Sequence, residues 1–586
     1  MKNAVLSELF DQMADVMEIL GEDRFRINTY RKVGRIIEDL PIDVEALLAD
    51  GTLAKVPGVG KSSLAKIEEF VKTGSITAHQ DLLQKIPATL LELLNVPGMG
   101  PKGVKAVYDL LNVKNLAGLK AAIADGSLAN LHGFGEKKVA SLAKGIEFLE
   151  KSSGRIRLDQ ATDAAERVTD FLRQIQGIDR IVPAGSLRRC AETVGDVDVL
   201  VTLTKGRTEA HAEQVLRAFT EAPFVKETLA AGSTKASALI ETGGTAVQVD
   251  VRVVPAESFG AAIQYFTGSK QHNVRLREIA VKHNLKLNEY GLFKVYKSGE
   301  QMVAGAKEQE IYAKLGLDYI DPRLRDDRGE VAAAQDHKLP NLVKIEDIRG
   351  DFHMHTQASD GACTLEELAQ IASDLGYEYI CITDHSHSSA IANGLDAKRL
   401  ARQIEQIRRL NQGLKGIRLL AGSEVDILAD GRLDFDDGLL ADLDYVIASI
   451  HSGMTGPREK VTTRTLKAMD NPFVTCIGHP TGRLLGERDA MDLDMAGVIR
   501  HAGLTGTALE VNANPYRLDL KDVHCKMAVE AGVKLAIGTD SHHPEGLALM
   551  GFGVSTAARG WATATNVLNT MSLAQLKKWI ASKRPR

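Results

Sequence analysis

Three aspartates in this sequence have the types and spacing of metal ligands. Asp196 and Asp198 in "GDVDVL" alternate with valines, so they share one face of a predicted strand. Asp250 in "VQVDVRV" joins them from a neighbouring predicted strand. Three carboxylates close together repel one another unless divalent cations neutralise them. We therefore expect metal ions here, in an arrangement that holds a triphosphate and a 3′-hydroxyl in line for phosphoryl transfer. Solvated acids at strand ends are the simpler interpretation, but it fits poorly because these acids lie within an apolar run.

A second set of candidate ligands begins in "DFHMHTQASD", residues 351–360. His353 and His355 are two positions apart, so on a strand both would point the same way. Ten of the sixteen histidines lie at or after His353, which marks the C-terminal part as chemically distinct. The pattern indicates a metal site.

The elements that position this second set are predicted to be parallel strands. After residue 350 come seven short apolar runs, each ending in polar residues and mostly separated by helical stretches: "DFHMH", "YICITDH", "LLAGSEVD", "YVIASIH", "TCIGHP", "ALEVNA" and "KLAIGTDSH". Strands that alternate with helices imply a parallel sheet. Polar residues at the C-terminal ends of such strands are where an α/β barrel keeps its chemistry.

Residues 1–150 have a helical pattern with one recurring glycine turn. It occurs in "KVPGVGKSSLAKI", "NVPGMGPKGVKAV" and "NLHGFGEKKVASL". The paired glycines are Gly58 and Gly60, Gly98 and Gly100, and Gly133 and Gly135. A tight turn before a helix N-terminus lets backbone amides meet a phosphate. The turn resembles the helix-hairpin-helix element, which binds the DNA backbone without reading its sequence. A glycine-capped helical turn is the alternative, and three copies with trailing lysines favour DNA binding.

Composition indicates an ordinary soluble protein of several domains. The chain has 586 residues, 44% of them apolar, and its length suggests about three to five domains. The net charge of −5 gives no overall basic footprint, so any DNA binding must depend on local geometry. Five dispersed cysteines and the absence of a leader or a membrane-length apolar run predict a cytoplasmic protein.

The motifs "GSLRRCAETVGDVDVL", "VDVRVVP", "YFTGSKQHN" and "LNEYGLF" resemble the X family of DNA polymerases, the polymerase beta-like repair enzymes. The resemblance runs through most of residues 1–320. It implies that Asp196, Asp198 and Asp250 bind two ions of Mg²⁺ or Mn²⁺ and carry catalysis. The implied nucleotide-binding residues are Gly185, Ser186, Arg189, Gly195, Tyr265, Phe266, Gly268, Asn273 and Arg277. The hairpin glycines and Lys235 are the implied DNA-binding residues.

Two positions within this resemblance need separate comment. The repair members of the family usually have an arginine two residues before the third aspartate, and this chain has Gln248 there, which predicts weaker primer gripping or proton removal near Asp250. Lys66 occupies the position of the family's 5′-deoxyribose-phosphate lyase lysine. A Schiff base needs a neutral amine, and Lys66 as a phosphate contact is an equal alternative.

The C-terminal part, roughly residues 350–575, resembles the polymerase and histidinol phosphatase (PHP) domain, a metal-dependent barrel phosphoesterase. The resemblance implies nine ligands for up to three metal ions: His353, His355, Asp360, His385, Glu424, His451, His479, Asp540 and His542. Such a set suits Zn²⁺ or Mn²⁺. Glu510 and Asn512 are candidates for groups that support the ligands. We expect His387, His501, His524 and His543 to have no role at the metal site.

The predicted fold is a multidomain α/β chain with a helical helix-hairpin-helix region, a polymerase beta-like nucleotidyltransferase palm and a distorted (β/α)7 PHP barrel. The expected parts are an N-terminal helical lyase-like DNA-binding domain (1–85), a fingers-like region (86–150), a palm (151–255), a thumb-like nucleotide-binding subdomain (256–320), a linker (321–349) and the PHP domain (350–586).

The predicted function is a repair DNA polymerase that also trims 3′ ends. Such a chain would bind gapped or primer-template DNA and dNTPs, and we expect a monomer. Two alternatives remain open. One is a PHP phosphatase of small phosphate esters that the N-terminal half tethers to DNA. The other is a non-catalytic DNA scaffold, against which the intact aspartate triad and the nine ligands argue.

Overall fold

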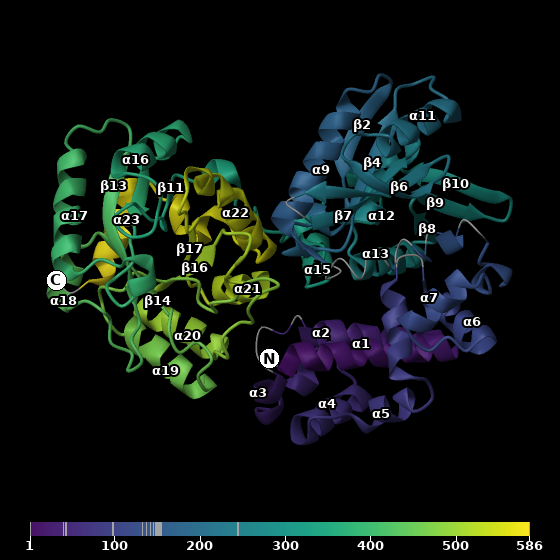
Figure 1. Cartoon of the computed structure of the whole chain (residues 1–586), viewed down its shortest axis with the longest axis horizontal. Helices are drawn as coiled ribbons and strands as arrows, with labels where there is room; N and C mark the ends of the chain where they lie inside the picture. The colour runs from purple at the N-terminus through teal and green to yellow at the C-terminus, as the bar shows by residue number, and fades with distance from the viewer. Residues whose placement is uncertain are drawn as a thin grey trace. The chain divides into compact units, whose positions relative to one another are not determined.

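The computed structural model describes residues 2–38, 40, 44–96, 99–131, 133–135, 138–140, 142–143, 146, 155–242 and 245–584. The chain forms two compact units. The first comprises Met1–Ile156, Gln160–Pro183 and Gly195–Pro255, and the second Arg157–Asp159, Ala184–Val194 and Ala256–Arg586. Figure 1 follows the chain from purple at the N-terminus to yellow at the C-terminus.

The N-terminal part of the first unit is a helical assembly around an apolar core. Leu6, Phe10 and Met13 of the first helix are fully buried, as is Ile37 of the second. Their spacing places them on one helix face, which is why the two helices pack together. The elements are α1 (Lys2–Leu20), α2 (Arg24–Glu38), α3 (Val44–Ala49), η1 (Leu53–Lys55), α4 (Lys61–Thr73), α5 (Thr77–Leu83), η2 (Ala88–Asn95), α6 (Pro101–Leu111), α7 (Leu116–Ala124) and η3 (Leu128–Asn130).

The palm part of the first unit is a five-stranded sheet in the order β2-β4-β7-β6-β5. Strands β4 and β7 are parallel, whereas β2 and β6 run antiparallel to them. Helix α11 packs on β5 and β6. The elements are β2 (Ile178–Pro183), β4 (Val197–Leu203), α11 (Glu209–Thr220), β5 (Val225–Ala231), β6 (Lys235–Thr242) and β7 (Thr245–Val253), preceded by β1 (Ile156–Arg157) and α9 (Leu158–Arg173).

The second unit begins with short segments and a small antiparallel sheet in the order β10-β9-β8. Helices α12 and α13 pack against β8. The elements are α10 (Gly185–Arg188), β3 (Thr193–Val194), η4 (Ala256–Ser258), α12 (Phe259–Thr267), α13 (Lys270–Lys282), β8 (Leu285–Asn288), β9 (Gly291–Tyr296), β10 (Gly299–Ala304) and α14 (Glu308–Lys314).

The segment 321–349, predicted as a linker, is more structured than that prediction. It contains η5 (Pro322–Leu324), α15 (Glu330–Gln335) and η6 (Ile345–Asp347). The side chain of Arg325 is fully buried and donates to the carbonyl of Ile320 and to Glu308. The charged composition of the segment suggested solvation, but its charges are paired within the fold, and a buried charge is tolerated when it is paired.

The rest of the second unit is a seven-stranded sheet in the sequential order β11 to β17, and every neighbouring pair is parallel. Chain just beyond the first and last strands also pairs, because His355 N donates to Ser541 O (2.9 Å) and Asp540 N to His353 O (2.8 Å). The sheet is therefore nearly closed into a barrel. The alternating pattern predicted its parallel strands, and the resemblance to the PHP domain implied the barrel. The strands are β11 (Gly350–Asp351), β12 (Tyr379–Ile382), β13 (Arg418–Asp426), β14 (Tyr445–Ser449), β15 (Cys476–Ile477), β16 (Ala508–Asn512) and β17 (Leu535–Gly538).

Helices surround these strands in the way that a (β/α) pattern requires (Figure 1). Helix α16 packs on β12, α17 on β13 and α22 on β17, each through an apolar face. The elements are α16 (Leu365–Asp374), η7 (Ala390–Ala392), α17 (Ala397–Leu410), α18 (Asp437–Asp442), α19 (Arg458–Met469), α20 (Met495–Thr505), α21 (Asp522–Glu530), η8 (Pro544–Leu549), α22 (Met550–Arg559), η9 (Ala564–Asn566), η10 (Leu568–Thr570) and α23 (Leu573–Lys583).

The structure also bears on the expectations about the cysteines and about membrane-spanning helices. All five cysteines are free thiols. Among the described helices, none is long and apolar enough to cross a bilayer.

Two candidate metal centres

The palm sheet brings the three predicted aspartates together. Asp198 on β4 lies directly opposite Asp250 on β7 in the parallel register, and Asp196 immediately precedes β4. Burial, and then the carboxylates of Asp196 and Asp250, raise the pKa of Asp198 to about 7. Burial and Asp250 also raise the pKa of Asp196. This mutual repulsion is what a divalent cation would relieve.

Three side chains of neighbouring strand positions contact this triad. The ammonium of Lys235 on β6 pairs with the carboxylate of Asp250. Arg252 Nη2 lies 3.8 Å from Asp250 Oδ2, and Nε lies 3.9 Å from Asp198 Oδ1. Gln248, where the repair enzymes have arginine, donates from Nε2 to Asp250 Oδ1 (3.1 Å). Lys235, which was predicted to bind DNA, supplies positive charge to the triad in this structure.

The predicted phosphate-binding residues lie around α10 of the second unit. Arg189 Nη1 donates to Thr267 O (2.5 Å), and Nε lies 3.2 Å from Asp326 Oδ1. Gly268 has φ 68°, and a Cβ added there would lie 3.3 Å from Arg189 Nη1, so a side chain would crowd the guanidinium. Gly185 has φ 64° at the start of α10, next to the partly exposed Ser186. Gly195 belongs to the first unit, where it precedes Asp196.

The predicted sugar and base contacts follow on α12 and α13. Tyr265 and Phe266 form an edge-to-face pair with ring centroids 5.2 Å apart. Asn273 is buried, its Nδ2 donates to Tyr265 O (2.7 Å), and Arg277 Nε donates to Asn273 O (3.2 Å). The hydrogen bonds therefore tie these residues into one local cluster.

The glycine turns have two different backbone conformations. Gly58 and Gly133 have φ of 97° and 86°, which a residue with a Cβ resists. Gly60 and Gly100 instead have extended backbone at the N-caps of α4 and α6. A Cβ added at Gly60, Gly100, Gly133 or Gly135 would meet no atom within 4 Å, so the backbone there is open to a ligand. Gly98 lies outside the described residues.

Lys66 lies on α4, half-buried. Its Nζ donates to Ser62 Oγ (3.0 Å) and lies 5.6 Å from the centroid of the Tyr30 ring. The lysine is thus held against its own helix and an aromatic face, a placement that either predicted role would allow.

The nine predicted PHP ligands lie at the C-terminal ends of the barrel strands. His353 and His355 follow β11, His385 follows β12, and Glu424 lies on β13. The remaining ligands occupy the next strand ends: His451 after β14, His479 after β15, and Asp540 and His542 after β17. Asp360 lies on the loop between β11 and α16. Parallel strands end at one edge, which is why positions spread over 190 residues meet.

Eight of the nine ligands form three compact groups in which the ligand atoms all lie within 4.8 Å of one another. The groups are His355, Asp360, His385 and His542; His353, His355 and Asp540; and His385, Glu424 and His451. His479 is outside these groups, but its Nε2 lies 2.8 Å from Glu424 Oε1. Because His355 and His385 are each shared by two groups, the three positions are contiguous.

Several buried nitrogen and oxygen atoms of the barrel ligands have no hydrogen-bond partner, as expected of atoms that bind a metal ion. Among the described residues, the buried atoms without a hydrogen-bond partner include His353 Nε2, His355 Nδ1, His385 Nδ1, Glu424 Oε2 and His479 Nδ1. A buried polar atom without a partner is costly, and imidazole and carboxylate lone pairs are ligands for Zn²⁺ and Mn²⁺. The donor set therefore suits such ions.

The charges of this centre compensate one another without a metal. Burial opposes protonation of His451, but Glu424 and Asp426 outweigh it and raise its pKa to about 10. Conversely, burial raises the pKa of Glu424, but the surrounding histidines outweigh it and lower this pKa well below its usual range. Metal binding would therefore displace protons from the histidines.

Supporting carboxylates hold the ligand rings in place. His353 Nδ1 donates to Glu510 Oε1 (2.6 Å), and His451 Nδ1 donates to Asp426 Oδ1 (2.7 Å). Asn512 Nδ2 donates to Asp540 Oδ2 (3.1 Å). The sequence reasoning suggested Glu510 and Asn512 but missed Asp426. Its signal was present, because Asp426 is two positions after Glu424 on one strand and so shares its face.

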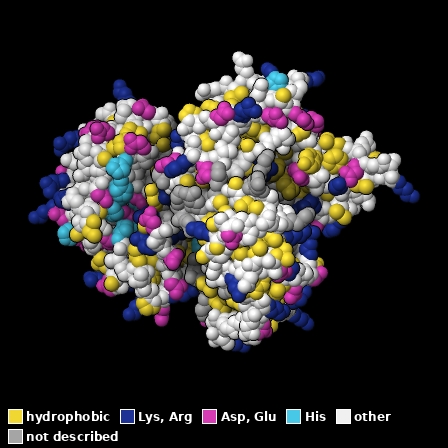
Figure 2. Space-filling model, turned by 45° about the vertical axis from the view of Figure 1, so that its right-hand side comes forward, with side chains coloured by type: hydrophobic (Ala, Val, Ile, Leu, Met, Phe, Trp, Pro, Cys, Tyr) yellow, Lys and Arg dark blue, Asp and Glu magenta, His cyan; other side chains and the backbone are white. Residues whose placement is uncertain are grey.

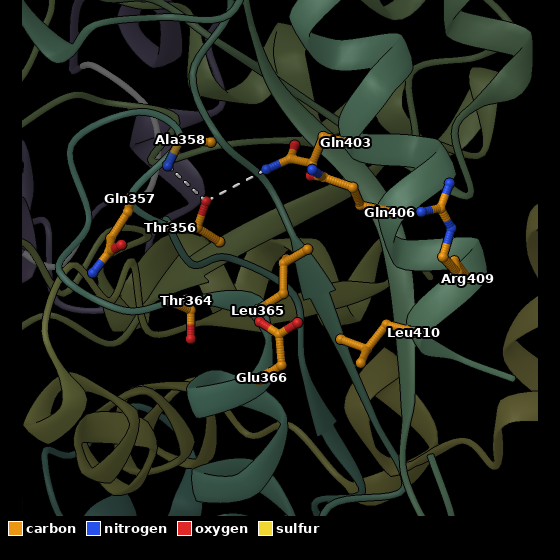
Figure 3. Close-up of a pocket in the computed structure, with 10 residues that line it drawn as sticks. All are labelled: Thr356, Gln357, Ala358, Thr364, Leu365, Glu366, Gln403, Gln406, Arg409 and Leu410. Atoms are coloured by element: carbon orange, nitrogen blue, oxygen red, sulfur yellow. Dashed lines mark hydrogen bonds between the residues drawn. The ribbon is translucent and has the colours of Figure 1, made fainter. Parts of the chain in front are cut away.

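The metal centre is open to solvent. Asp360, His451 and His542 keep 33%, 26% and 32% of their side-chain surface exposed. Figure 2 shows histidine side chains gathered in a band on the molecular surface. A separate pocket of about 470 Å³ lies beside the segment between His355 and Asp360, lined by that segment, α16 and α17 (Figure 3). No predicted metal ligand lines it.

Family comparisons cover most of the chain. Sequence models match a helix-hairpin-helix domain at residues 1–76, a SAM-like helix-hairpin-helix tandem at 90–147, the DNA polymerase beta palm at 155–255, the DNA polymerase beta thumb at 262–326 and the PHP domain at 351–512.

Whole-chain similarity decides the family. The chain is 36% identical over 572 residues to the DNA polymerase/3′-5′ exonuclease PolX of Bacillus subtilis (strain 168), which covers 98% of both chains. This chain belongs to the PolX family of X-family DNA polymerases that carry a PHP domain. A probable phosphatase of Thermoanaerobacter sp. (strain X514) is 29% identical over 245 residues, 40% of this chain and 95% of its own. One from Syntrophotalea carbinolica is 28% identical over 230 residues, 37% of this chain and 90% of its own.

Proposed function

We propose that this chain is a gap-filling DNA repair polymerase that removes nucleotides from 3′ ends with its PHP barrel. The observation that carries the proposal is the full-length similarity to PolX, since the probable phosphatases match only 40% and 37% of this chain. A phosphatase merely tethered to DNA would not need the triad of Asp196, Asp198 and Asp250.

In nucleotide addition, the primer 3′-oxygen forms a bond to the α-phosphorus of a dNTP and pyrophosphate leaves. Asp196, Asp198 and Asp250 would hold two divalent cations, Mg²⁺ or Mn²⁺. Ser186 and Arg189, with Gly185 and Gly195 nearby, would bind the triphosphate. Tyr265 and Phe266 would face the sugar, beside Gly268, with Asn273 at the base edge and Arg277 at the template. Lys235 and Arg252 would balance the triad charge until the ions bind.

In 3′-end removal, water cleaves the terminal phosphodiester and a nucleoside monophosphate leaves. The nine barrel ligands would hold two to three ions of Zn²⁺ or Mn²⁺. In both centres such ions neutralise phosphate charge, and in the barrel they also lower the pKa of an attacking water. Glu510 and Asp426 would keep the rings of His353 and His451 oriented.

The proposed partners are gapped or primer-template DNA and dNTPs. Glycine turns at Gly58, Gly60, Gly98, Gly100, Gly133 and Gly135 would contact the DNA backbone, with a monomer acting in the cytoplasm. Lys66, in the same DNA-binding region, would act either as a 5′-deoxyribose-phosphate lyase nucleophile or as a phosphate contact.

The decisive test uses a labelled primer at a one-nucleotide gap, with and without dNTPs, in Mg²⁺, Mn²⁺ or Zn²⁺. We expect extension by one nucleotide with dNTPs and shortening from the 3′ end without them. Release of phosphate from free nucleotides, with labelled DNA left intact, would favour the tethered phosphatase. Binding without either reaction would favour the scaffold.

A further inference from the structure

One isoleucine beside the barrel metal centre is fully exposed. Ile391 has a relative exposure of 107%, the largest among the exposed large hydrophobic side chains of the described residues. Burying an isoleucine side chain usually stabilises a fold, so a fold that leaves one entirely in water forgoes that contribution. Tyr516, another exposed apolar side chain of this unit, is different because the Arg157 guanidinium covers its ring at 3.6 Å.

Ile391 lies at the tip of a loop that begins and ends at a metal ligand. The loop comprises residues 386–395, and Leu395 N donates to His385 O (2.7 Å). Ser389 Oγ donates to Asp426 Oδ2 (2.7 Å), the same carboxylate that accepts from His451. Two residues span at most about 7 Å, so the backbone of Ile391 lies within that distance of Ser389, whose hydroxyl contacts the ligand-supporting Asp426.

The loop is also tied to a third ligand segment. Asn393 Nδ2 donates to Ala358 O and Ser359 O, both at 3.2 Å, immediately before Asp360. Ser388 donates from N and from Oγ to Asp434, each at 2.6 Å. These bonds fix the loop on both sides of its tip. Rearrangement that would tuck Ile391 into the core would have to break them.

A rigid apolar side chain at the mouth of a phosphodiesterase site fits one ligand chemistry, the stacked bases at a DNA end. Proteins that separate base steps commonly insert an isoleucine, leucine or phenylalanine between the unstacked bases. We propose that Ile391 is a wedge that separates the 3′-terminal base pair, so that the freed strand reaches the metal centre. The proposal rests on the 3′-end removal proposed above.

The test compares rates of 3′ degradation of single-stranded DNA, of a duplex with a terminal mismatch and of a fully paired duplex. Ile391→Ala should slow the paired end about tenfold, equivalent to about 1.4 kcal/mol, and change the other two little. Ile391→Leu should keep the wild-type rate. Leu504→Ala is the matched control, because Leu504 is 84% exposed in the last turn of α20 and lies four residues before the start of β16, at the strand edge opposite the ligands.

A second readout needs no cleavage. With 2-aminopurine as the 3′-terminal base of a duplex and chelator present, wild type should raise its fluorescence more than Ile391→Ala does. Equal slowing of all three substrates, or no slowing of the paired end, would overturn the wedge. If wild type degrades none of the substrates, the proposed exonuclease function fails, and the fluorescence comparison still decides the wedge.

Discussion

In the palm sheet, Asp198 and Asp250 face Lys235 and Arg252, whereas in the barrel Glu424 is surrounded by histidines. Asp540 of the barrel contacts both histidines and Arg517. Lysine and arginine are permanent cations at neutral pH, so they compensate the triad but cannot ligate a metal. Histidines do both, because each can give up its proton and bind an ion through the same nitrogen.

The difference implies two ways of using metal ions. The barrel ligands are held by buried carboxylates and already lie in compact groups, which suits ions that stay bound. The palm triad is not among those compact groups of the described residues. Ions that arrive with a nucleotide triphosphate would complete it, because phosphate oxygens supply the missing ligands.

The largest expected effect separates the two centres. Asp250→Ala should lower nucleotide addition by about 10³-fold or more and leave 3′ degradation of unpaired ends unchanged, since the two ligand sets share no residue. His353→Ala should do the reverse. Both activities are measured on the same labelled gapped substrate, with melting curves to verify folding. If each folded variant loses both activities, the comparison of independent centres is wrong.

A smaller effect tests whether the barrel depends on its supporting carboxylates. Glu510→Gln should weaken metal affinity by about 10- to 100-fold, because the acceptor that orients the His353 ring loses its charge. Metal titration of the chelated protein measures this directly. Glu378→Gln, at an exposed pair with Arg349, should have no effect. Unchanged affinity in Glu510→Gln would show that the ligands need no such support.

The raised pKa of Asp198 predicts a pH-dependent stability in the palm. Its native pKa of about 7 exceeds the ordinary value of 3.8, so between these values the native state holds a proton that the unfolded state has lost. The free energy of unfolding contributed by this group therefore falls as pH rises through that window. Asp198→Asn should stabilise the metal-free protein at pH 8 by on the order of 1 kcal/mol and have little effect at pH 4.

Thermal melting with chelator at both pH values measures that change. Asp170→Asn, an exposed carboxylate beside Arg173, is the control. Stabilisation of equal size at both pH values would contradict the repulsion described for the triad.

A further prediction concerns how the glycine turns bind the DNA backbone. Gly60→Val should weaken binding to gapped DNA by about threefold to tenfold for any base sequence, because its side chain would block approach to the backbone amides. Gly60 has negative φ and open space, so the variant should fold. Gly551→Val on α22 is the control. Fluorescence anisotropy measures the affinity for two gapped DNAs of unrelated base sequence. A loss of affinity for only one of the two DNAs would contradict the prediction.

The smallest effect on affinity is expected at Lys66. If it is the lyase nucleophile, borohydride should trap an adduct with a 5′-deoxyribose-phosphate end, and Lys66→Ala should abolish trapping while DNA affinity changes by less than about threefold. Absence of a wild-type adduct, or equal trapping by the variant, would leave Lys66 as a phosphate contact.

The sequence predicted those parts of the sites that depend on one strand and its motif. The alternating acids of β4 and the polar strand ends of the barrel have a period that survives in the fold, so the pattern indicated Asp196, Asp198 and a metal site at His353 and His355. The full set of nine barrel ligands was implied by the resemblance to the PHP domain. The alternation of strands and helices predicted a parallel sheet, which the structure confirms, and the resemblance to the PHP domain implied that this sheet forms a barrel.

Contacts between charged side chains that are far apart in the sequence could not be predicted from it. Arg325 is charged and follows a proline-containing stretch, yet it is fully buried because Glu308 and the Ile320 carbonyl accept its hydrogen bonds. Lys235 and Arg252 likewise reach the triad through the register of β6 and β7, which no local pattern encodes. Such contacts depend on partners that meet only after the sheet forms.

The pairing of His353 with Asp540, which nearly closes the barrel, also bears on protein synthesis. A ribosome completes the palm triad when it has added Asp250, before any of the nine barrel ligands exists, and the hydrolytic centre is complete only after Asp540 and His542, which follow the last strand. Nascent chains would therefore acquire the parts for joining nucleotides well before those for removing them. Premature termination anywhere between these points would yield a fragment without the complete hydrolytic centre, so truncated products could not shorten DNA ends through it.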